Sequence, residues 1–456
     1  MPSPDQQHLP KREVLVCIIV ATLTVPILQN LFFRMSDPTF DEFQYIDYAL
    51  NIHDHGVFGL SGKYRDNVPA PEYINSPLYP ALLAFTIWLD PELEAKLKCL
   101  IINRGSSGKT CPGNFRSIIV VQDVLVIGAL VCLWLTAMLL YKRALVAWIT
   151  CALVLASTKP LFFANHLLTE ILILFFFACL MLGLVLALKH ARRKCWPVIG
   201  AIIGLMTLTR PEYVYLAYLL TLLGIVIAVI RHSKPASTSL VLFIVAFCAI
   251  LGPWVARNHH HFGQYAVTGG YSDIIISQRV AYNRMSPGEW TVAFLYWLPG
   301  HGETLTATLF PDADYSKLGT DPGSYYFTES VTLYDQGMAD VGGDRDRLTG
   351  HLIRSEILDH PVRHLATSIP LAWRGILAGK YLAVPGLPCF VILVIASMRN
   401  RDWMFPILTL PALAMAGLYA GVSVSIPRYN VYLIYYYAIA VAWVLVFLID
   451  RKRANS

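Results

Sequence analysis

Long apolar runs separated by short basic segments make up most of this chain. The first run covers residues 14–33, about 20 residues, which is the length that an α-helix needs to cross the hydrocarbon core of a bilayer. Further runs of similar composition follow it. The pattern predicts an all-α protein with about ten transmembrane helices, at residues 14–33, 117–140, 144–163, 167–188, 195–210, 211–230, 239–256, 383–398, 403–422 and 428–449.

The basic residues between these runs predict the orientation of the chain. Positive charges favour the cytoplasmic ends of transmembrane helices. The segments expected on that side are 11–12, 141–143, 189–194, 231–234, 399–401 and 451–453. Because the number of crossings is even, both termini are expected on the cytoplasmic side.

Two longer regions are expected on the outer side of the membrane. The first, 34–116, contains an apolar segment at 77–89 that is too short to span and begins with prolines, which favours an interfacial or re-entrant helix. The second, 257–380, has glycine-rich and aspartate-rich loops, a helix expected at 348–358 and an amphipathic stretch at 361–380. The predicted division is a transmembrane module at 1–265, an outer region at 266–380 and C-terminal transmembrane helices at 381–456.

The composition agrees with a multi-pass membrane protein. Of the 456 residues, 56% are hydrophobic and only 14% are charged, and the mean hydropathy is +0.53. The net charge of +6 lies mainly in short loops, where it sets topology, so nucleic acid is not an expected partner. The first run is longer than the core of a signal peptide and no small-residue cleavage site follows it, so we expect a retained helix. The interior contains no Asn-x-Ser/Thr sequence, which favours a bacterial plasma membrane.

Two adjacent acids, Asp41 and Glu42, follow the first run in a chain that has few acids. Thr39 and Glu42 have the spacing of a capping box, and Asp41 would favour the positive end of the helix dipole. A catalytic role is the alternative, and the two roles are compatible because a capped helix holds an acid rigidly. Neighbouring helical positions point about 100° apart, so Asp41 is expected to share a face with Tyr45 and Tyr48 while Glu42 points elsewhere.

Further charged residues are expected at the outer ends of the membrane helices. Glu170 begins the run 167–188, with Lys159 as its candidate partner. An acid in such a run is costly and therefore a functional candidate, unless it lies shallow enough to stay hydrated. Arg210 and Glu212 form a tight outer turn, in which they either pair with each other or hold a ligand phosphate.

Two more arginines, Arg257 and Arg428, are expected at outer ends, with Tyr429 beside the second. Arginines at such positions commonly extend toward the membrane interface. However, acids and arginines that meet on the face with both large loops form a more specific pattern, because guanidinium groups suit bidentate binding of phosphate. Together these charges predict a site for a phosphate-bearing ligand on the outer face.

The cysteines, glycines and histidines add little to this picture. Cys99 and Cys111 both lie in the first outer loop, where a disulfide and two free thiols are both open alternatives. The glycine-rich segment 105–110 has Asn103 where a phosphate loop requires glycine, so it does not indicate a nucleotide site. The histidines at 259–261 would diverge in any regular structure, so they do not indicate a metal site.

In order and spacing, several of these residues resemble the landmarks of GT-C glycosyltransferases, in the branch of protein O-mannosyltransferases and the lipid A aminoarabinose transferase. The resemblance covers roughly residues 10–265. Beyond them, only Arg428 and Tyr429 still resemble the landmarks of this family. It rests on the first-loop acids Asp41 and Glu42 with Tyr45, the proline-led segment 77–89, Arg116, the later acidic motif 168–172, the segment 204–212, and Pro253-Trp254 with Arg257-Asn258. Where the aminoarabinose transferases carry a lysine before the interfacial proline, this chain has Asn75-Ser76, which leaves the sugar open.

The resemblance implies a GT-C-like bundle and an inverting glycosyltransferase that uses a polyprenyl-phosphate sugar on the extracytoplasmic face. Asp41 would be the general base, and Glu42 would cap or position. Glu170 would orient the acceptor or pair with a phosphate-binding cation. The residues implied in phosphate or substrate binding are Tyr45, Lys159, Arg210, Glu212, Arg257, Arg428 and Tyr429.

The expected partners are therefore the lipid-linked donor, membrane lipids and an acceptor that is a lipid, a glycan or a protein. The scheme requires no metal; a divalent cation is compatible with it, but no residue pattern indicates one. The alternative from another class is a transporter or flippase of an anionic lipid or lipid-linked sugar. Transporters typically show inverted repeats and charges near the bilayer midplane, whereas this sequence shows no repeat and places its charges at outer ends.

Overall fold

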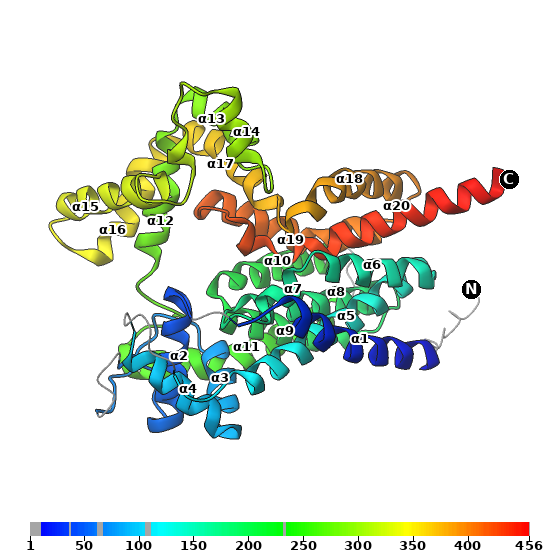
Figure 1. Cartoon of the computed structure of the whole chain (residues 1–456), viewed down its shortest axis with the longest axis horizontal. Helices are drawn as coiled ribbons and strands as arrows, with labels where there is room; N and C mark the ends of the chain where they lie inside the picture. Colours follow the sequence, from blue (N-terminus) through cyan, green and yellow to red (C-terminus); the bar gives the residue numbers. More distant parts are fainter. Residues whose placement is uncertain (1–10, 36–37, 62–66, 105–110, 231–233, 456) are drawn as a thin grey trace. The chain divides into compact units, whose positions relative to one another are not determined.

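The computed structural model describes residues 11–455 apart from 36–37, 62–66, 105–110 and 231–233. The glycine-rich segment 105–110 and most of the basic segment 231–234 therefore lie outside the described residues. Every regular element in the described part is a helix (Figure 1). The expected all-α fold is confirmed.

The chain forms two compact units, each of which is described here by itself. The first contains Met1–Thr268, Ala396–Leu408 and Ala438–Ser456, and the second contains Gly269–Ile395 and Thr409–Tyr437. Residues 381–456, expected to form one C-terminal part, are divided between the units. The unit boundaries there fall within three long helices, α18 (Ala383–Arg399), α19 (Met404–Val422) and α20 (Leu433–Asn455).

Eight helices of the described part are long and apolar enough to cross a membrane, which agrees with an integral membrane protein. They are Lys11–Phe32, Arg116–Tyr141, Glu170–Leu188, Pro211–Ile230, Ser237–Phe262, Lys380–Arg399, Met404–Val422 and Leu433–Ala454. These correspond to eight of the ten expected runs.

The other two expected runs form shorter helices. α6 (Ala144–Ala156) has 13 residues and does not continue to 163, because Thr158 adopts a left-handed backbone with φ 60° before the short α7 (Lys159–Phe163). α9 (Cys195–Thr209) has 15 residues, and Arg210 follows it as the C-cap. Arg210 is extended because the helical conformation is disfavoured for a residue that precedes proline.

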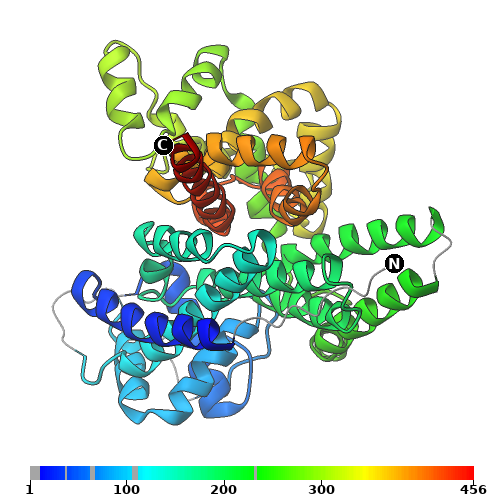
Figure 2. The same cartoon turned by 90° about the vertical axis from the view of Figure 1, so that its right-hand side faces the viewer.

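The first unit is built around α8 (Glu170–Leu188), which is buried on nearly all sides. α5 (Arg116–Tyr141) packs between α8 and α1 (Lys11–Phe32), while α9 packs between α8 and α11 (Lys234–Phe262) (Figures 1 and 2). Small residues allow these helices to approach closely. A Cβ added at Gly128 of α5, for example, would lie 2.8 Å from the ring of Phe175 on α8.

Three shorter helices of the segment 34–116 pack against one another: α2 (Phe40–His55), α3 (Leu78–Leu89) and α4 (Pro91–Ile102). α2 begins with the expected capping box, in which Thr39 is the N-cap and Glu42 the third helical residue. α3 has 12 residues and is too short to cross a bilayer, as predicted for the segment 77–89. Cys99 of α4 forms a disulfide with Cys111, with Cα atoms 5.6 Å apart, and so ties α4 to the segment that leads into α5.

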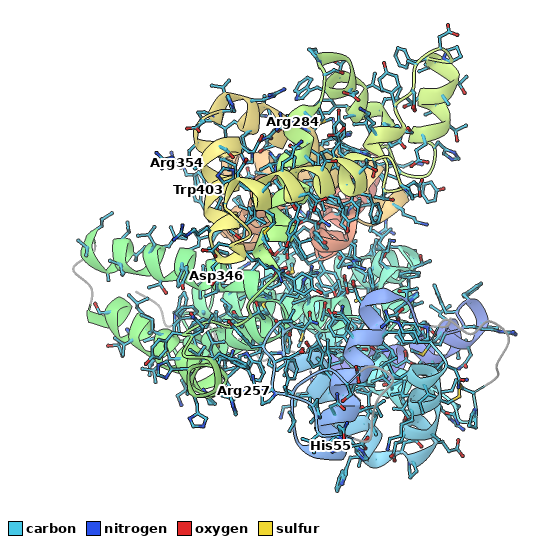
Figure 3. All side chains as sticks on the ribbon, turned by 90° about the vertical axis from the view of Figure 1, so that its left-hand side faces the viewer. His55, Arg257, Arg284, Asp346, Arg354 and Trp403 are labelled. Atoms are coloured by element: carbon cyan, nitrogen blue, oxygen red, sulfur yellow. A yellow bond between two sulfur atoms is a disulfide. The ribbon has the colours of Figure 1, made fainter. Side chains whose placement is uncertain are left out.

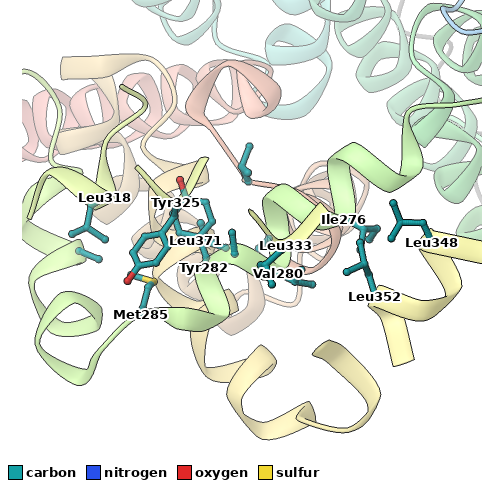
Figure 4. Packing of buried hydrophobic residues seen from close by; sticks show 14 residues of the cluster. Ile276, Val280, Tyr282, Met285, Leu318, Tyr325, Leu333, Leu348, Leu352 and Leu371 are labelled. Atoms are coloured by element: carbon teal, nitrogen blue, oxygen red, sulfur yellow. The ribbon is translucent and has the colours of Figure 1, made fainter. Parts of the chain in front are cut away.

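The second unit has its own hydrophobic core. Its helices before the membrane segments are α12 (Ser272–Ala281), α13 (Pro287–Tyr296), α14 (Gly302–Leu309), α15 (Ser330–Asp340), α16 (Arg345–Leu352), the π-helix η5 (Ile353–Leu358) and α17 (Pro361–Ile376). Figure 4 shows a cluster of buried hydrophobic residues in this unit, among them Val280, Tyr282 and Leu333. The helix expected at 348–358 is formed by the end of α16 together with η5.

The amphipathic stretch expected at 361–380 is α17 and the turn after it. One face of α17 leaves Val362 and Leu365 exposed by 80% and 67%. The opposite face holds the fully buried Arg279 of α12, which donates to the carbonyl oxygen of His364 at 3.0 Å and to Ser368 Oγ at 2.6 Å. Its Nε also donates to the carbonyl oxygen of Ala420 at 2.8 Å. Neutral oxygens thus accept the hydrogen bonds of this guanidinium, and these bonds join three helices of the second unit.

Replacing Gly375 by alanine is expected to destabilise the second unit. A Cβ there would collide with Ser425 Oγ and lie 2.6 Å from Asn430 Nδ2, and both side chains are fully buried. Such overpacking costs about 1–3 kcal/mol, which thermal unfolding of the detergent-solubilised protein would detect. Gly350→Ala is the matched control, because nothing lies within 4 Å of its added Cβ. An equal melting temperature for the two variants would contradict the packing.

Candidate functional site

Asp41 and Glu42 occupy the first turn of α2 but lie in different surroundings. Asp41 is exposed, whereas only 1% of Glu42 is exposed. The difference follows from the rotation of about 100° between neighbouring helical positions, which turns Glu42 toward the protein interior. The two acids of the motif therefore cannot perform the same role.

The carboxylate of Glu42 is fully engaged within the protein. Its Oε2 accepts hydrogen bonds from the backbone N–H and the hydroxyl of Thr39, at 2.7 and 2.9 Å. Its Oε1 accepts from the backbone N–H of Leu167 at 2.8 Å and lies 3.3 Å from Nδ1 of His166. Burial raises the pKa of Glu42, but these hydrogen bonds together outweigh burial and hold the pKa below its usual value. Glu42 is thus an ionised anchor that fastens the loop between α7 and α8 to α2.

A second connection reaches the same loop from α3 and α5. The hydroxyl of Tyr79 donates to Oε1 of Gln122 at 2.9 Å, and Nε2 of Gln122 donates to the carbonyl oxygen of Ala164 at 2.9 Å. Both side chains are fully buried. Tyr45 packs edge-on against Tyr79, with ring centroids 5.5 Å apart. Burial, and then the charge of Glu42, raise the pKa of Tyr79 well above its usual value, so its hydroxyl remains a donor.

Glu170 begins α8 directly after this loop and is only 2% exposed. Its Oε1 lies 3.7 Å from Nη1 of Arg210, whose Nε donates to Glu212 at 3.0 Å. Arg210 therefore bridges two acids, and the pairing of Arg210 with Glu212 expected as one alternative is present. Lys159, the candidate partner of Glu170, begins α7 with its ammonium 5.4 Å from the ring centroid of Phe162.

Arg257 holds a loop in place in this structure. Its guanidinium donates to the carbonyl oxygens of Glu72 and Phe58, at 2.6 and 3.3 Å, and lies 4.7 Å from the ring centroid of Trp254. Figure 3 labels Arg257, which belongs to α11. The hydroxyl of Tyr48 donates to Glu72 as well, at 2.9 Å. Arg257 thus joins α11 to the segment between α2 and α3, and its expected role in phosphate binding stays a prediction.

Arg428 and Tyr429 belong to the second unit, in the 3-10 helix η7 (Pro427–Asn430). The guanidinium of Arg428 lies 5.8 Å from the ring centroid of Tyr429, which packs against Tyr419. Their expected role in substrate binding stays a prediction. The site described here is therefore built from the first unit.

Metal-ligating side chains also gather at one place in the described part of the chain. His53 and Asp54 of α2 lie close to Glu94 of α4. Between the two carboxylates lies the ammonium of Lys98, 3.0 Å from Asp54 and 2.8 Å from Glu94. We interpret this group as an ion-pair cluster that joins α2 and α4, because Lys98 already supplies the positive charge.

Sequence reasoning missed three side chains of this site, Tyr79, Gln122 and His166. A signal existed for Gln122, because a polar residue in a transmembrane run is costly unless it has a specific partner. No signal existed for the partners of Glu42 beyond Thr39, because one of them is a backbone N–H more than 120 residues away.

Known proteins resemble this chain in structure but not in sequence. The sequence matches no protein-family model and no curated protein. The structure is similar to the Archaeoglobus fulgidus oligosaccharyltransferase in complex with Zn and sulfate, with a TM-score of 0.50 and 12% identity over 96% of this chain and 49% of that one. The chain thus spans about half the length of that protein.

Weaker similarities involve ArnT from Cupriavidus metallidurans, in the apo state and bound to undecaprenyl phosphate. Their TM-scores are 0.41 and 0.43, at 14% identity over 95% of this chain and 77% of the other. At these identities a likeness concerns the fold and not the activity. The expected architecture is confirmed: the chain is a polytopic all-α protein with a GT-C-like fold.

Proposed function

We propose that this protein is an inverting membrane glycosyltransferase that transfers a sugar from a polyprenyl-phosphate donor to an acceptor hydroxyl on the extracytoplasmic face. The observation that carries the proposal is the division of roles between the two acids of α2. Glu42 is buried and used entirely for anchoring, whereas Asp41 is presented to solvent from the same rigid, capped turn. This arrangement suits a general base, which must reach a substrate while its backbone stays fixed.

In the proposed reaction, Asp41 accepts the proton of the acceptor hydroxyl. The hydroxyl oxygen forms a bond to the anomeric carbon from the side opposite the phosphate. The bond between that carbon and the phosphate oxygen breaks, and its electron pair leaves with the lipid phosphate. A single displacement of this kind inverts the anomeric configuration.

The departing phosphate requires positive charge that is already in place. In the first unit Arg210 and Arg257 are the candidates, and Arg257 is held by neutral backbone carbonyl oxygens, which leave its positive charge unneutralised. Glu170 and Glu212 hold the guanidinium of Arg210 in a fixed position. Fixed guanidinium groups supply the charge stabilisation that other enzymes obtain from a metal ion.

Two features support an extracytoplasmic site. The disulfide between Cys99 and Cys111 lies in the same outer loop as Asp41, and disulfides persist in oxidising compartments. The basic segments of the chain favour the opposite side of the membrane. Nucleotide sugars are cytosolic, so a donor carried by a membrane lipid suits an enzyme that works outside the cytosol.

The proposal is tested by transfer of labelled sugar from a panel of polyprenyl-phosphate sugars in proteoliposomes. The expected result is a glycosylated product with inverted configuration and release of the lipid phosphate. Net movement of the lipid-linked sugar across the bilayer without any product would instead support the transporter alternative and contradict the proposal.

A further inference from the structure

His166 lies in the loop between α7 and α8, at the place where this loop meets α2. Its Nδ1 is 3.3 Å from Oε1 of Glu42, and its ring packs against that of Phe162 with centroids 4.4 Å apart. The side chain of His166 is 19% exposed, whereas that of Glu42 is 2% exposed. A half-buried imidazole is thus held from the inside by a buried carboxylate and still reaches solvent.

In the neutral form of the His166 ring, the contact with Glu42 fixes the tautomer. Because the carboxylate is ionised and can only accept, Nδ1 carries the hydrogen. Nε2 then keeps its lone pair and acts as an acceptor. Within the described part of the chain, no residue forms a hydrogen bond with Nε2. A carboxylate at one ring nitrogen of a histidine commonly sets which nitrogen carries the hydrogen and how the ring is oriented.

We propose that Nε2 of His166 is a substrate-binding atom that accepts a hydrogen bond from a hydroxyl group. This inference rests on the proposed glycosyl transfer and deepens it, because sugar donors and their acceptors both carry hydroxyl groups. Glu42, which holds His166, directly follows Asp41 in α2, so His166 lies beside the helical turn that carries the proposed base.

The surroundings favour a hydroxyl over a phosphate as the ligand of Nε2. A neutral imidazole nitrogen with a lone pair repels a phosphate oxygen, which is also an acceptor. The ionised Glu42 behind the ring strengthens this repulsion, because its negative charge is buried close to the ring. A hydroxyl group can donate to Nε2 and keep its own oxygen available for other contacts.

A merely structural role for His166 makes a different prediction. If the ring serves only to satisfy Glu42, any side chain that donates from the position of Nδ1 would replace it. Asparagine places its amide nitrogen at about that position and has no atom at the position of Nε2. His166→Asn therefore preserves the contact with Glu42 and removes the proposed binding atom.

The test compares sugar transfer by the wild type and by His166→Asn, with donor and acceptor concentrations varied separately. We expect an unchanged melting temperature and a rise in KM of about tenfold for the substrate that carries the hydroxyl, the size expected for one lost hydrogen bond. The substrate whose KM rises shows whether the hydroxyl belongs to the donor or to the acceptor. Unchanged KM values and an unchanged kcat would overturn the inference.

A second measurement covers the case in which His166→Asn also loses stability. Deoxy analogues of the affected substrate, each lacking one hydroxyl, are compared in both proteins. One analogue is expected to bind the wild type about tenfold more weakly than the parent substrate and to bind His166→Asn as well as the parent does. If every analogue loses as much binding affinity, relative to the parent substrate, with the variant as with the wild type, His166 contacts none of the hydroxyls and the inference is wrong.

These outcomes are distinct from failure of the proposed function. That failure appears in the wild type itself, as the absence of transfer from every donor of the panel. Failure of the inference about His166 appears only in the variant, in a protein that transfers sugar.

Discussion

Asp41→Asn is expected to lower kcat for sugar transfer by about 10²–10⁴-fold, the contribution typical of a general base. Asparagine has nearly the same shape but cannot accept the proton of the attacking hydroxyl. Because Asp41 is exposed and Glu42 supplies the capping interactions of α2, the substitution should leave the melting temperature nearly unchanged. The measurement is the initial rate of transfer in proteoliposomes with a donor that the wild type uses.

Asp54→Asn is the matched control for Asp41→Asn. Asp54 lies in the last turn of the same helix, where it pairs with Lys98 at 3.0 Å. Its replacement removes a partly exposed ion pair and should leave the transfer rate nearly unchanged. If Asp41→Asn retains full turnover, another group accepts the proton and the proposed mechanism is wrong.

Glu42→Gln is expected to destabilise the first unit by about 2–4 kcal/mol, because a buried charged acceptor is lost and donors are left without a partner. The carboxylate receives three donors and faces a fourth, from Thr39, Leu167 and His166. In glutamine an amide NH₂ group replaces one of the two accepting oxygens. This group can only donate, and it would face N–H or O–H groups that also donate. The measurement is thermal unfolding in detergent at neutral pH.

Glu94→Gln provides the comparison for Glu42→Gln. Glu94 makes a partly exposed ion pair with Lys98 on the surface of α4, so its loss should cost no more than about 1 kcal/mol. Equal destabilisation by the two substitutions would contradict the anchoring role of Glu42.

The pKa of Glu42 adds a pH dependence to this prediction. Because the pKa in the folded state lies below the usual value of 4.5, the stabilisation by Glu42 is complete above pH 4.5. It is lost as the pH falls through the lower, folded-state pKa. Glu42→Gln should therefore remove part of the acid destabilisation that the wild type shows below pH 4.5.

The sequence predicted the features that depend on neighbouring residues. The length of apolar runs indicated the membrane helices, and the spacing of Thr39 and Glu42 indicated the capping box that begins α2. Both rest on local geometry, because the rise of a helix and the reach of a cap involve only a few residues. The prediction failed at 144–163, where the left-handed backbone of Thr158 interrupts the helix. A local signal was present there, because Pro160 follows two residues later and a proline within a helical pattern commonly marks a break.

The partners within the site could not be predicted in this way. Tyr79 reaches Ala164 through Gln122, and Arg257 reaches the carbonyl oxygen of Glu72 across 185 positions. Several of these partners are backbone atoms, which every residue carries and which therefore leave no mark in a sequence.

What the sequence by itself determined is a polytopic helical protein with an acidic pair at the start of a capped helix that follows its first membrane segment. Only the tertiary structure decided how the pair divides its roles. The loop before α8 places a backbone N–H and His166 against Glu42 and leaves Asp41 exposed. The physical reason is that a carboxylate is buried only where donors surround it, and the folded chain surrounds Glu42 with the donors of Thr39 and Leu167.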